Sequence, residues 1–98
     1  MDRSQTVNDL RRHEAPLRRM GVTRLALFGS LARGEARPDS DIDVVVDIAP
    51  NRKYTLVDHS TVRLYLADLF GRDVDVVVRR AMPREMRRRV ADEEVPVF

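Results

Sequence analysis

Apolar residues along the chain follow two different patterns, and these predict its strands and helices. Runs of β-branched or continuous apolar residues predict strands, whereas apolar residues that recur every three or four positions predict helices. The strands are expected at residues 22–28, 41–48 and 74–78. The helices are expected at about 4–20, 55–70 and 83–90, with a short helical turn at 31–33.

Local chemistry sets the predicted ends of the helices. Ser4 or Thr6 is expected to cap the first helix, and Gly21 lies just past its end. Pro16 falls inside this helix and should kink it or end it early. Gly71 should end the helix at 55–70. The apolar tail at 95–98 is expected to fold back onto the body of the protein.

The order of these elements predicts the fold class. Helix, strand, helical turn, strand, helix, strand, helix is an α/β pattern. We expect one small mixed β-sheet with helices packed on one side. The chain has 98 residues and contains no linker or repeat, so residues 1–98 should form a single domain.

One stretch, "LALFGSLARGEARPDSDIDVVV" at residues 25–46, carries candidate chemistry. Side chains alternate between the two faces of a strand, so Asp41 and Asp43 share one face while Ile42 and Val44 point to the other. The two aspartate Cα atoms should lie about 6.6–6.8 Å apart. Carboxylates at this spacing can hold two cations about 3.5–4 Å apart for phosphoryl chemistry. Ligands that are all oxygen favour Mg²⁺.

A third carboxylate is expected from the strand at 74–78. Asp73 and Asp75 share one face, and Asp75 is the better candidate because Asp73 sits at the strand entrance. If this strand pairs beside the strand at 41–48, three aspartates are crowded together and repel one another unless a cation neutralises them. Asp47 shares the parity of Asp43 but lies about 13 Å further along, so it is interpreted as a solvated residue at the strand end.

A phosphate cradle is predicted beside these carboxylates. Gly29 allows the backbone to approach a ligand, and the amides that open a helical turn attract anions. Ser30 adds a hydroxyl donor, and Arg33 can supply a bidentate fork for phosphate. The pattern Gly-Ser, ten residues, Asp-x-Asp arises by chance in about one chain in a thousand of this length. It points to a nucleoside triphosphate handled with Mg²⁺.

Composition narrows the remaining choices. The chain has no Cys, so disulfides, thiolate zinc sites and cysteine nucleophiles are excluded. Eighteen basic and sixteen acidic residues give a net charge of +2, and nucleic acid is not an expected partner. No signal sequence and no apolar run of about 20 residues is present, so we expect a cytoplasmic protein without a membrane partner.

Gly29-Ser30, the following "LARG", "RPDSDIDVVV" and the later "VDVVV" resemble the polymerase β nucleotidyltransferase superfamily. The short chain resembles its smallest branch, the minimal nucleotidyltransferase (MNT) antitoxins that accompany HEPN-domain ribonuclease toxins. This resemblance extends from "LRRHEAPLRRMGV" to "VPVF". Such antitoxins move AMP from ATP onto a tyrosine of the partner toxin and thereby silence it.

The resemblance implies roles for particular residues. Asp41 and Asp43 would hold two Mg²⁺ ions, and Asp75 would be the third carboxylate, which helps to activate the attacking hydroxyl. Gly29, Ser30 and Arg33 would hold the triphosphate of ATP. The acceptor would be presented by a HEPN toxin in a hetero-oligomer, because few residues follow the Asp-x-Asp motif.

Two alternatives stay open at this point. The protein could neutralise its partner by binding alone, or it could transfer nucleotides to RNA or a small molecule. The second alternative would use the arginines of "MRRRV" at 86–90, whose simpler interpretation is complementation of a helix dipole in a last turn. His13 and His59 are interpreted as surface or packing residues, and Tyr65 as a core residue.

Overall fold

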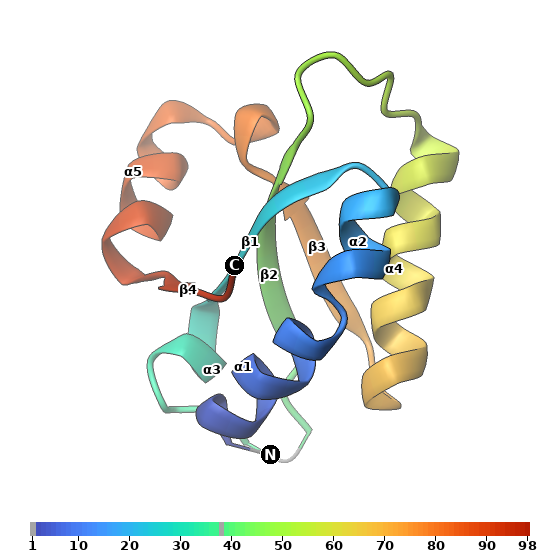
Figure 1. Cartoon of the computed structure of the whole chain (residues 1–98). Coiled ribbons are helices and arrows are strands. Elements are labelled where there is room, and N and C mark those ends of the chain that lie inside the picture. Colours follow the sequence, from blue (N-terminus) through green and yellow to red (C-terminus); the bar gives the residue numbers. More distant parts are fainter. Residues whose placement is uncertain (1, 38) are drawn as a thin grey trace.

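The computed structural model describes residues 2–37 and 39–98. Its centre is a four-stranded mixed sheet in the order β3-β2-β1-β4 (Figure 1). Within the described residues, no helix is both long and apolar enough to cross a membrane. The expected α/β class and small mixed sheet are confirmed. The elements are α1 (Arg3–Arg12), α2 (Glu14–Arg19), β1 (Val22–Phe28), α3 (Gly29–Ala32), β2 (Ile42–Ile48), α4 (Leu56–Phe70), β3 (Val74–Val78), a 3₁₀ helix η1 (Arg79–Ala81), α5 (Arg84–Glu93) and β4 (Val95–Pro96).

The N-terminal helix is divided in two, as Pro16 predicted. α1 ends at Arg12 and α2 begins at Glu14, since the proline ring cannot donate a hydrogen bond to the preceding turn and clashes with it. The predicted cap is wrong: the Asp2 carboxylate, not Ser4 or Thr6, accepts from the backbone amide of Gln5. An aspartate one residue before the first turn satisfies an otherwise unpaired amide in the same way.

The helix after the second strand matches its prediction. Thr55 caps α4 and forms a capping box with Asp58. Gly71 ends it in the left-handed conformation, at φ 65°, which a residue with a Cβ rarely adopts. α4 connects β2 to β3, so these two strands run parallel. β1 and β2 are antiparallel, as are β1 and β4.

The main core lies between one face of the sheet and the helices α1, α2 and α4. The even-numbered residues of β2 point into it, as expected from strand alternation. Leu10, Leu17, Val62 and Leu66 supply the helical side and are all fully buried. This layer fixes the register of β2, because a slip of one residue would bury its aspartates.

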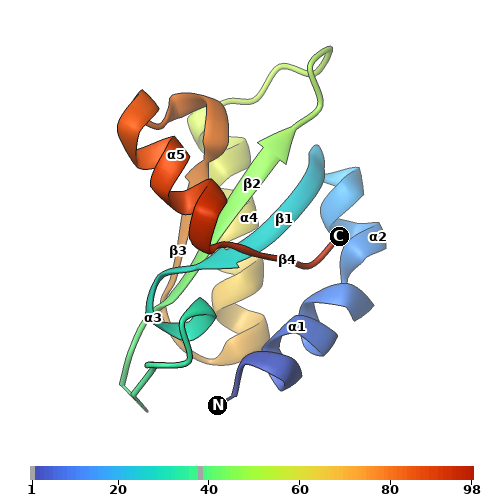
Figure 2. The ribbon, with the colours of Figure 1, turned by 90° about the vertical axis from the view of Figure 1, so that its left-hand side faces the viewer.

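The other face of the sheet is also covered by a helix. The expectation of helices on one side only was therefore wrong. Figures 1 and 2 show α5 on the side of the sheet opposite α4. Val90 of α5 and Met82 pack there against Ala26 and Val45 in a second, smaller cluster. The physical reason is that Ala26 and Val45 are apolar residues on the second face and need cover.

The C-terminal helix is also longer than expected. It continues to Glu93 because no helix breaker interrupts it, although the apolar pattern ends at Val90. The arginines at 87–89 therefore lie in its middle, and they cannot complement the dipole of a last turn. The tail folds back as expected: β4 pairs with β1, and Val97 is buried in the main core.

Candidate active site

The end of β1 and the start of β2 meet because the two strands are antiparallel. Phe28, the last residue of β1, pairs with Asp43. Gly29 follows with a φ of +75° and opens α3. A Cβ on Gly29 would collide with the Asp43 carboxylate, so only glycine allows the backbone to pass this close. The predicted cradle and the predicted carboxylate are thus in direct contact.

Parallel pairing of β2 and β3 brings the second pair of carboxylates together. Asp43 and Asp75 are direct partners in the register, on the same face of the sheet. Burial raises the pKa of the Asp43 carboxyl, and the charges of Asp75 and then Asp41 raise it further. Arg33 opposes this effect. The structure therefore brings Asp41, Asp43 and Asp75 within electrostatic range of one another.

Asp73 lies at the entrance to β3, as expected. It is exposed, and its carbonyl oxygen accepts a hydrogen bond from the Ile42 amide, which makes it part of the connection between strands. The assignment of the third carboxylate to Asp75 rather than Asp73 is thus consistent with the register.

The three aspartates suit a hard cation in their chemistry. Their donors are all carboxylate oxygens, and like charges held this close favour a cation that neutralises them. Across residues 2–37 and 39–98, however, no three His, Cys, Asp or Glu side chains are gathered closely enough to form a metal site. The structure places Asp43 and Asp75 side by side in the register, and the charge of Asp41 acts on Asp43.

Ser30 and Arg33 complete the predicted cradle on α3. Ser30 is half-buried in the first turn, and Arg33 is the residue at which the helix ends. The Arg33 guanidinium donates to Glu35 at 3.2 Å and to Glu93 of α5 at 3.4 Å. The hydrogen bond to Glu35 is the main reason that the pKa of Arg33 is raised. Its charge is therefore retained beside Asp43.

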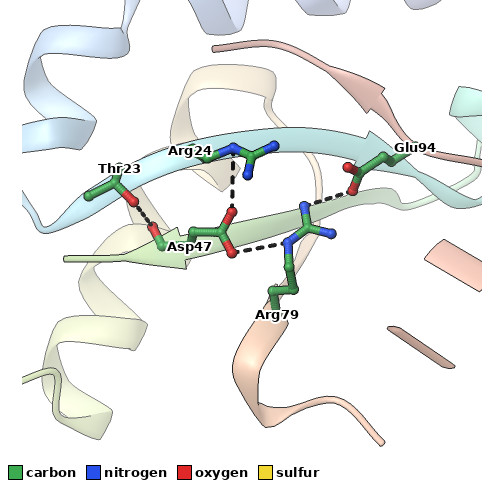
Figure 3. A network of polar contacts seen from close by, with 5 residues as sticks. All are labelled: Thr23, Arg24, Asp47, Arg79 and Glu94. Carbon is green, nitrogen blue, oxygen red and sulfur yellow. Dashed lines mark hydrogen bonds and ion pairs between the residues drawn. The ribbon is translucent and has the colours of Figure 1, made fainter. Parts of the chain in front are cut away.

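Asp47 is not the solvated residue that the sequence predicted. Its Oδ1 accepts from Nε of Arg79 at 3.0 Å, and Arg24 lies 3.8 Å from its Oδ2 (Figure 3). The second arm of Arg79 donates to Glu94 at 2.7 Å. The backbone carbonyl oxygen of Asp47 accepts a hydrogen bond from the Thr23 hydroxyl. Asp47 is the centre of a partly buried network that joins β1, β2, η1 and the end of α5.

The two histidines take packing roles, as expected. His13 is hydrogen-bonded to the hydroxyl of Tyr65, which packs against the main core. His59 lies edge-on to Tyr54 and 3.1 Å from its hydroxyl. Burial raises the pKa of the Tyr54 hydroxyl. None of these four residues lies beside the aspartates in the register of the sheet.

An apolar hollow of about 340 Å³ lies between α4 and β3. Val76 and Val78 line it, and they point away from the face that carries Asp75. This hollow is therefore separate from the aspartates.

Sequence analysis missed the approach of α5 to the cradle. Glu93 contacts Arg33 across 60 residues, and no local pattern marks such a pair. The spacing of Met82, Met86 and Val90 was the available signal, since these residues recur every four positions and form an apolar stripe.

Comparison with known proteins gives the same picture along almost the whole chain. Residues 10–98 match the family model described as "Nucleotidyltransferase domain". The chain is 36% identical over 86 residues to the protein adenylyltransferase MntA of Thermococcus cleftensis, which covers 87% of this chain and 85% of the relative.

Solved structures share the fold. One, described as "Structure of putative minimal nucleotidyltransferase", superposes with a TM-score of 0.81 at 40% identity and covers 98% of this chain and 96% of that chain. Another is described as a tri-AMPylated HEPN toxin of Shewanella oneidensis in complex with an MNT antitoxin. It superposes with a TM-score of 0.61 at 20% identity, over 88% of this chain and 69% of that chain.

Proposed function

This chain belongs to the nucleotidyltransferase domain family, and we propose that it is a Mg²⁺-dependent adenylyltransferase that acts as an antitoxin. Its substrate is ATP, and its acceptor is a tyrosine hydroxyl of a partner toxin with a HEPN domain. Transfer of AMP to that tyrosine silences the toxin. The protein works as a single domain in the cytoplasm, where ATP and Mg²⁺ are available.

One observation carries the proposal: the backbone of Gly29 lies directly against the carboxylate of Asp43, which is itself paired with Asp75. A nucleotide held by Gly29 and Ser30 would have its phosphates next to these carboxylates. Neither feature is needed to stabilise the fold, because crowding of aspartates raises the free energy of the folded protein.

The three aspartates are the proposed metal ligands. Asp41, Asp43 and Asp75 would hold two Mg²⁺ ions, and their oxygen donors fit that ion. When bound, these ions supply the positive charge that neutralises the carboxylates and the phosphates. The polypeptide supplies the fixed spacing: the pairing of β2 with β3 holds Asp43 and Asp75 in place before any ligand arrives.

The transfer step is an in-line displacement at the α-phosphorus of ATP. The acceptor hydroxyl oxygen forms a bond to the α-phosphorus, and the bond from that phosphorus to the oxygen that bridges to the β-phosphate breaks. Pyrophosphate leaves with the electrons of that bond. The carboxylate of Asp75 accepts the proton of the hydroxyl. Gly29, Ser30 and Arg33 hold and orient the triphosphate.

In this proposal, the acceptor hydroxyl comes from a partner protein. The adenylyltransferase name of the Thermococcus cleftensis relative supports a protein acceptor. The complex of an AMPylated HEPN toxin with an MNT antitoxin, which shares this fold, supports a HEPN partner. Together they favour this acceptor over RNA or a small molecule.

The direct test uses ATP labelled at the α-phosphate, Mg²⁺, this protein and the HEPN protein encoded by the neighbouring gene. We expect label on the partner, and loss of that label when its tyrosine acceptor is changed to Phe. A variant with Asp41→Asn and Asp43→Asn should transfer nothing while it keeps the fold, as checked by circular dichroism. Undiminished transfer by this variant would overturn the proposed mechanism.

The rival functions give other results in the same experiment. A protein that neutralises its partner by binding alone would form a tight complex without label, and its double Asn variant would still protect cells. A transferase for RNA would label RNA ends, and its binding would weaken steeply with salt.

A further inference from the structure

A hollow of about 210 Å³ lies between the end of α3 and the second half of α5. Its lining consists of Arg33, Met86, Arg89, Val90 and Glu93. Arg33 connects it to the aspartates, because the charge of Arg33 acts on Asp43. Because α3 follows β1 and Asp75 lies on β3, at opposite sides of β2, the hollow continues the proposed site on the side away from Asp75.

The wall that α5 provides is firmly attached to the sheet. Val90 is buried against Val45, and Met86 packs on the same cluster. Just after the helix, Glu94 is bound by Arg79, which also binds Asp47 of β2 (Figure 3). The lining residues are thus held at a fixed distance from α3.

Positive charge exceeds negative charge in this hollow. Two guanidinium groups, of Arg33 and Arg89, share it with the single carboxylate of Glu93. Within residues 2–37 and 39–98, Arg89 forms no hydrogen bond or ion pair. An exposed hollow with one unpaired arginine is suited to an additional anion.

The bond between Arg33 and Glu93 is easy to replace. Both side chains are about half exposed, at 43% and 51%, and ion pairs at such exposure contribute little to stability. Glu93 also lies in the last turn of α5, where the helix dipole disfavours a carboxylate. An anion of higher charge can therefore displace Glu93 from Arg33 at low cost.

We propose that this hollow is the subsite for the terminal phosphates of the nucleotide, with Arg89 as a second phosphate ligand and Glu93 as an internal competitor. The inference rests on the proposed function and assigns the far end of its substrate. The α-phosphate lies by Asp43, and the chain of phosphates runs past Arg33 toward α5. Until those phosphates arrive, Arg33 is bound by Glu93 and, outside the hollow, by Glu35.

The size and lining of the hollow favour phosphates over the adenine base. Pockets for whole ligands measure roughly 300–1,000 Å³, so this hollow suits only one end of a nucleotide. Two guanidinium groups recognise phosphate oxygens in a bidentate manner. Of the three consecutive arginines in α5, only Arg89 lines the hollow, so Arg88 offers a matched control.

The test measures dissociation constants of ATP, pyrophosphate and AMP by calorimetry with Mg²⁺, for the full chain and three variants. Arg89→Gln should weaken the binding of ATP and of pyrophosphate about tenfold and leave the binding of AMP unchanged, because AMP has no terminal phosphates. Arg88→Gln should leave all three unchanged. Glu93→Gln should strengthen the binding of ATP and of pyrophosphate about threefold, because the competing carboxylate is removed.

Three results would overturn the inference: equal behaviour of Arg89→Gln and Arg88→Gln, equal loss of AMP and ATP affinity, or weaker ATP binding by Glu93→Gln. Its failure is distinguishable from failure of the proposed function. If wild-type protein transfers the label but Arg89→Gln does not weaken ATP binding, only the proposed subsite is overturned. ATP binding that depends on Arg89, without transfer to any partner, supports the subsite and overturns the adenylyltransferase. A wild-type chain that binds neither ATP nor pyrophosphate overturns both.

Discussion

Asp43 and Asp47 lie four residues apart on β2 and point to the same face of the sheet. Each is partly buried. Their surroundings are opposite in charge: Asp43 has Asp41 and Asp75 as electrostatic neighbours, whereas Asp47 is bound by Arg79. One strand therefore carries both a carboxylate that the protein neutralises itself and one that it leaves beside like charges.

The difference separates a carboxylate with a structural role from one that we propose to be functional. The ion pairs of Asp47 join segments far apart in the chain, and they stabilise the position of α5. Burial and the charges of Asp75 and Asp41 destabilise the ionised form of Asp43, and the charge of Arg33 offsets this effect only in part. A residue type and a strand position alone do not distinguish these two cases. The partners across the sheet do.

Among changes in the Asp43 region, we expect Gly29→Ala to have the largest effect on activity. The new Cβ would collide with the Asp43 carboxylate and displace it, and misplacement by about 1 Å can cost about a hundredfold in rate. We expect transfer to the partner to fall by about that factor, as measured with labelled ATP.

Gly34→Ala is the matched control for this change. Gly34 has nearly the same φ, +76°, but among the described residues no atom beyond its chain neighbours lies within 4 Å of the Cβ position. Both alanines carry the same backbone strain of about 1–2 kcal/mol, so stability should fall alike in both variants. Equal loss of transfer in the two variants would show that backbone strain, and not contact with Asp43, causes the defect.

The Asp47 region should respond in stability instead. Arg79→Met leaves Asp47 and Glu94 without their shared partner, and the free energy of unfolding should fall by about 2 kcal/mol, between the values for exposed and fully buried pairs. Arg24→Met is the control: Arg24 is 66% exposed and 3.8 Å from Asp47, so its loss should cost less than about 0.5 kcal/mol. Urea unfolding of both variants checks the difference, and equal effects would contradict it.

The smallest effect concerns pH. Because the pKa of Asp43 is raised above its ordinary value of 3.8, its ionised form destabilises the folded protein. In metal-free protein at pH 7, Asp43→Asn should therefore increase Tm. As pH falls through the raised pKa, wild type takes up a proton and regains this stability, and the difference should disappear below pH 3.8. A lower Tm for Asp43→Asn at pH 7 without metal would contradict this account.

Much of the fold could be predicted because its signals are local. The strand bounds at 22–28 and 74–78 follow from apolar runs, and α4 follows from Thr55, Asp58 and Gly71 at its ends. The position of α5 could not be predicted in the same way, because it depends on which apolar residues of the second sheet face remain to be buried. Its stripe of Met82, Met86 and Val90 marks a buried side but not which surface it meets.

The candidate site shows the same contrast between local features, which could be predicted, and long-range contacts, which could not. Gly29 and Asp43 were predicted together because they belong to one motif, and the β2–β3 register agrees with the expectation for Asp75. The partners of Asp47 and the contact of Arg33 with Glu93 join residues 32 and 60 positions apart. Charged pairs that meet across such separations leave no periodic pattern in a sequence.

The most direct test of the account compares label transfer by wild type, Asp43→Asn and Asp47→Asn, each normalised to folded protein. The two variants change the same residue type on the same face of one strand. We predict that Asp43→Asn abolishes transfer of AMP to the HEPN partner and that Asp47→Asn retains it. Equal activity of the two variants, or loss of transfer only in Asp47→Asn, would contradict the assignment of Asp43 to catalysis.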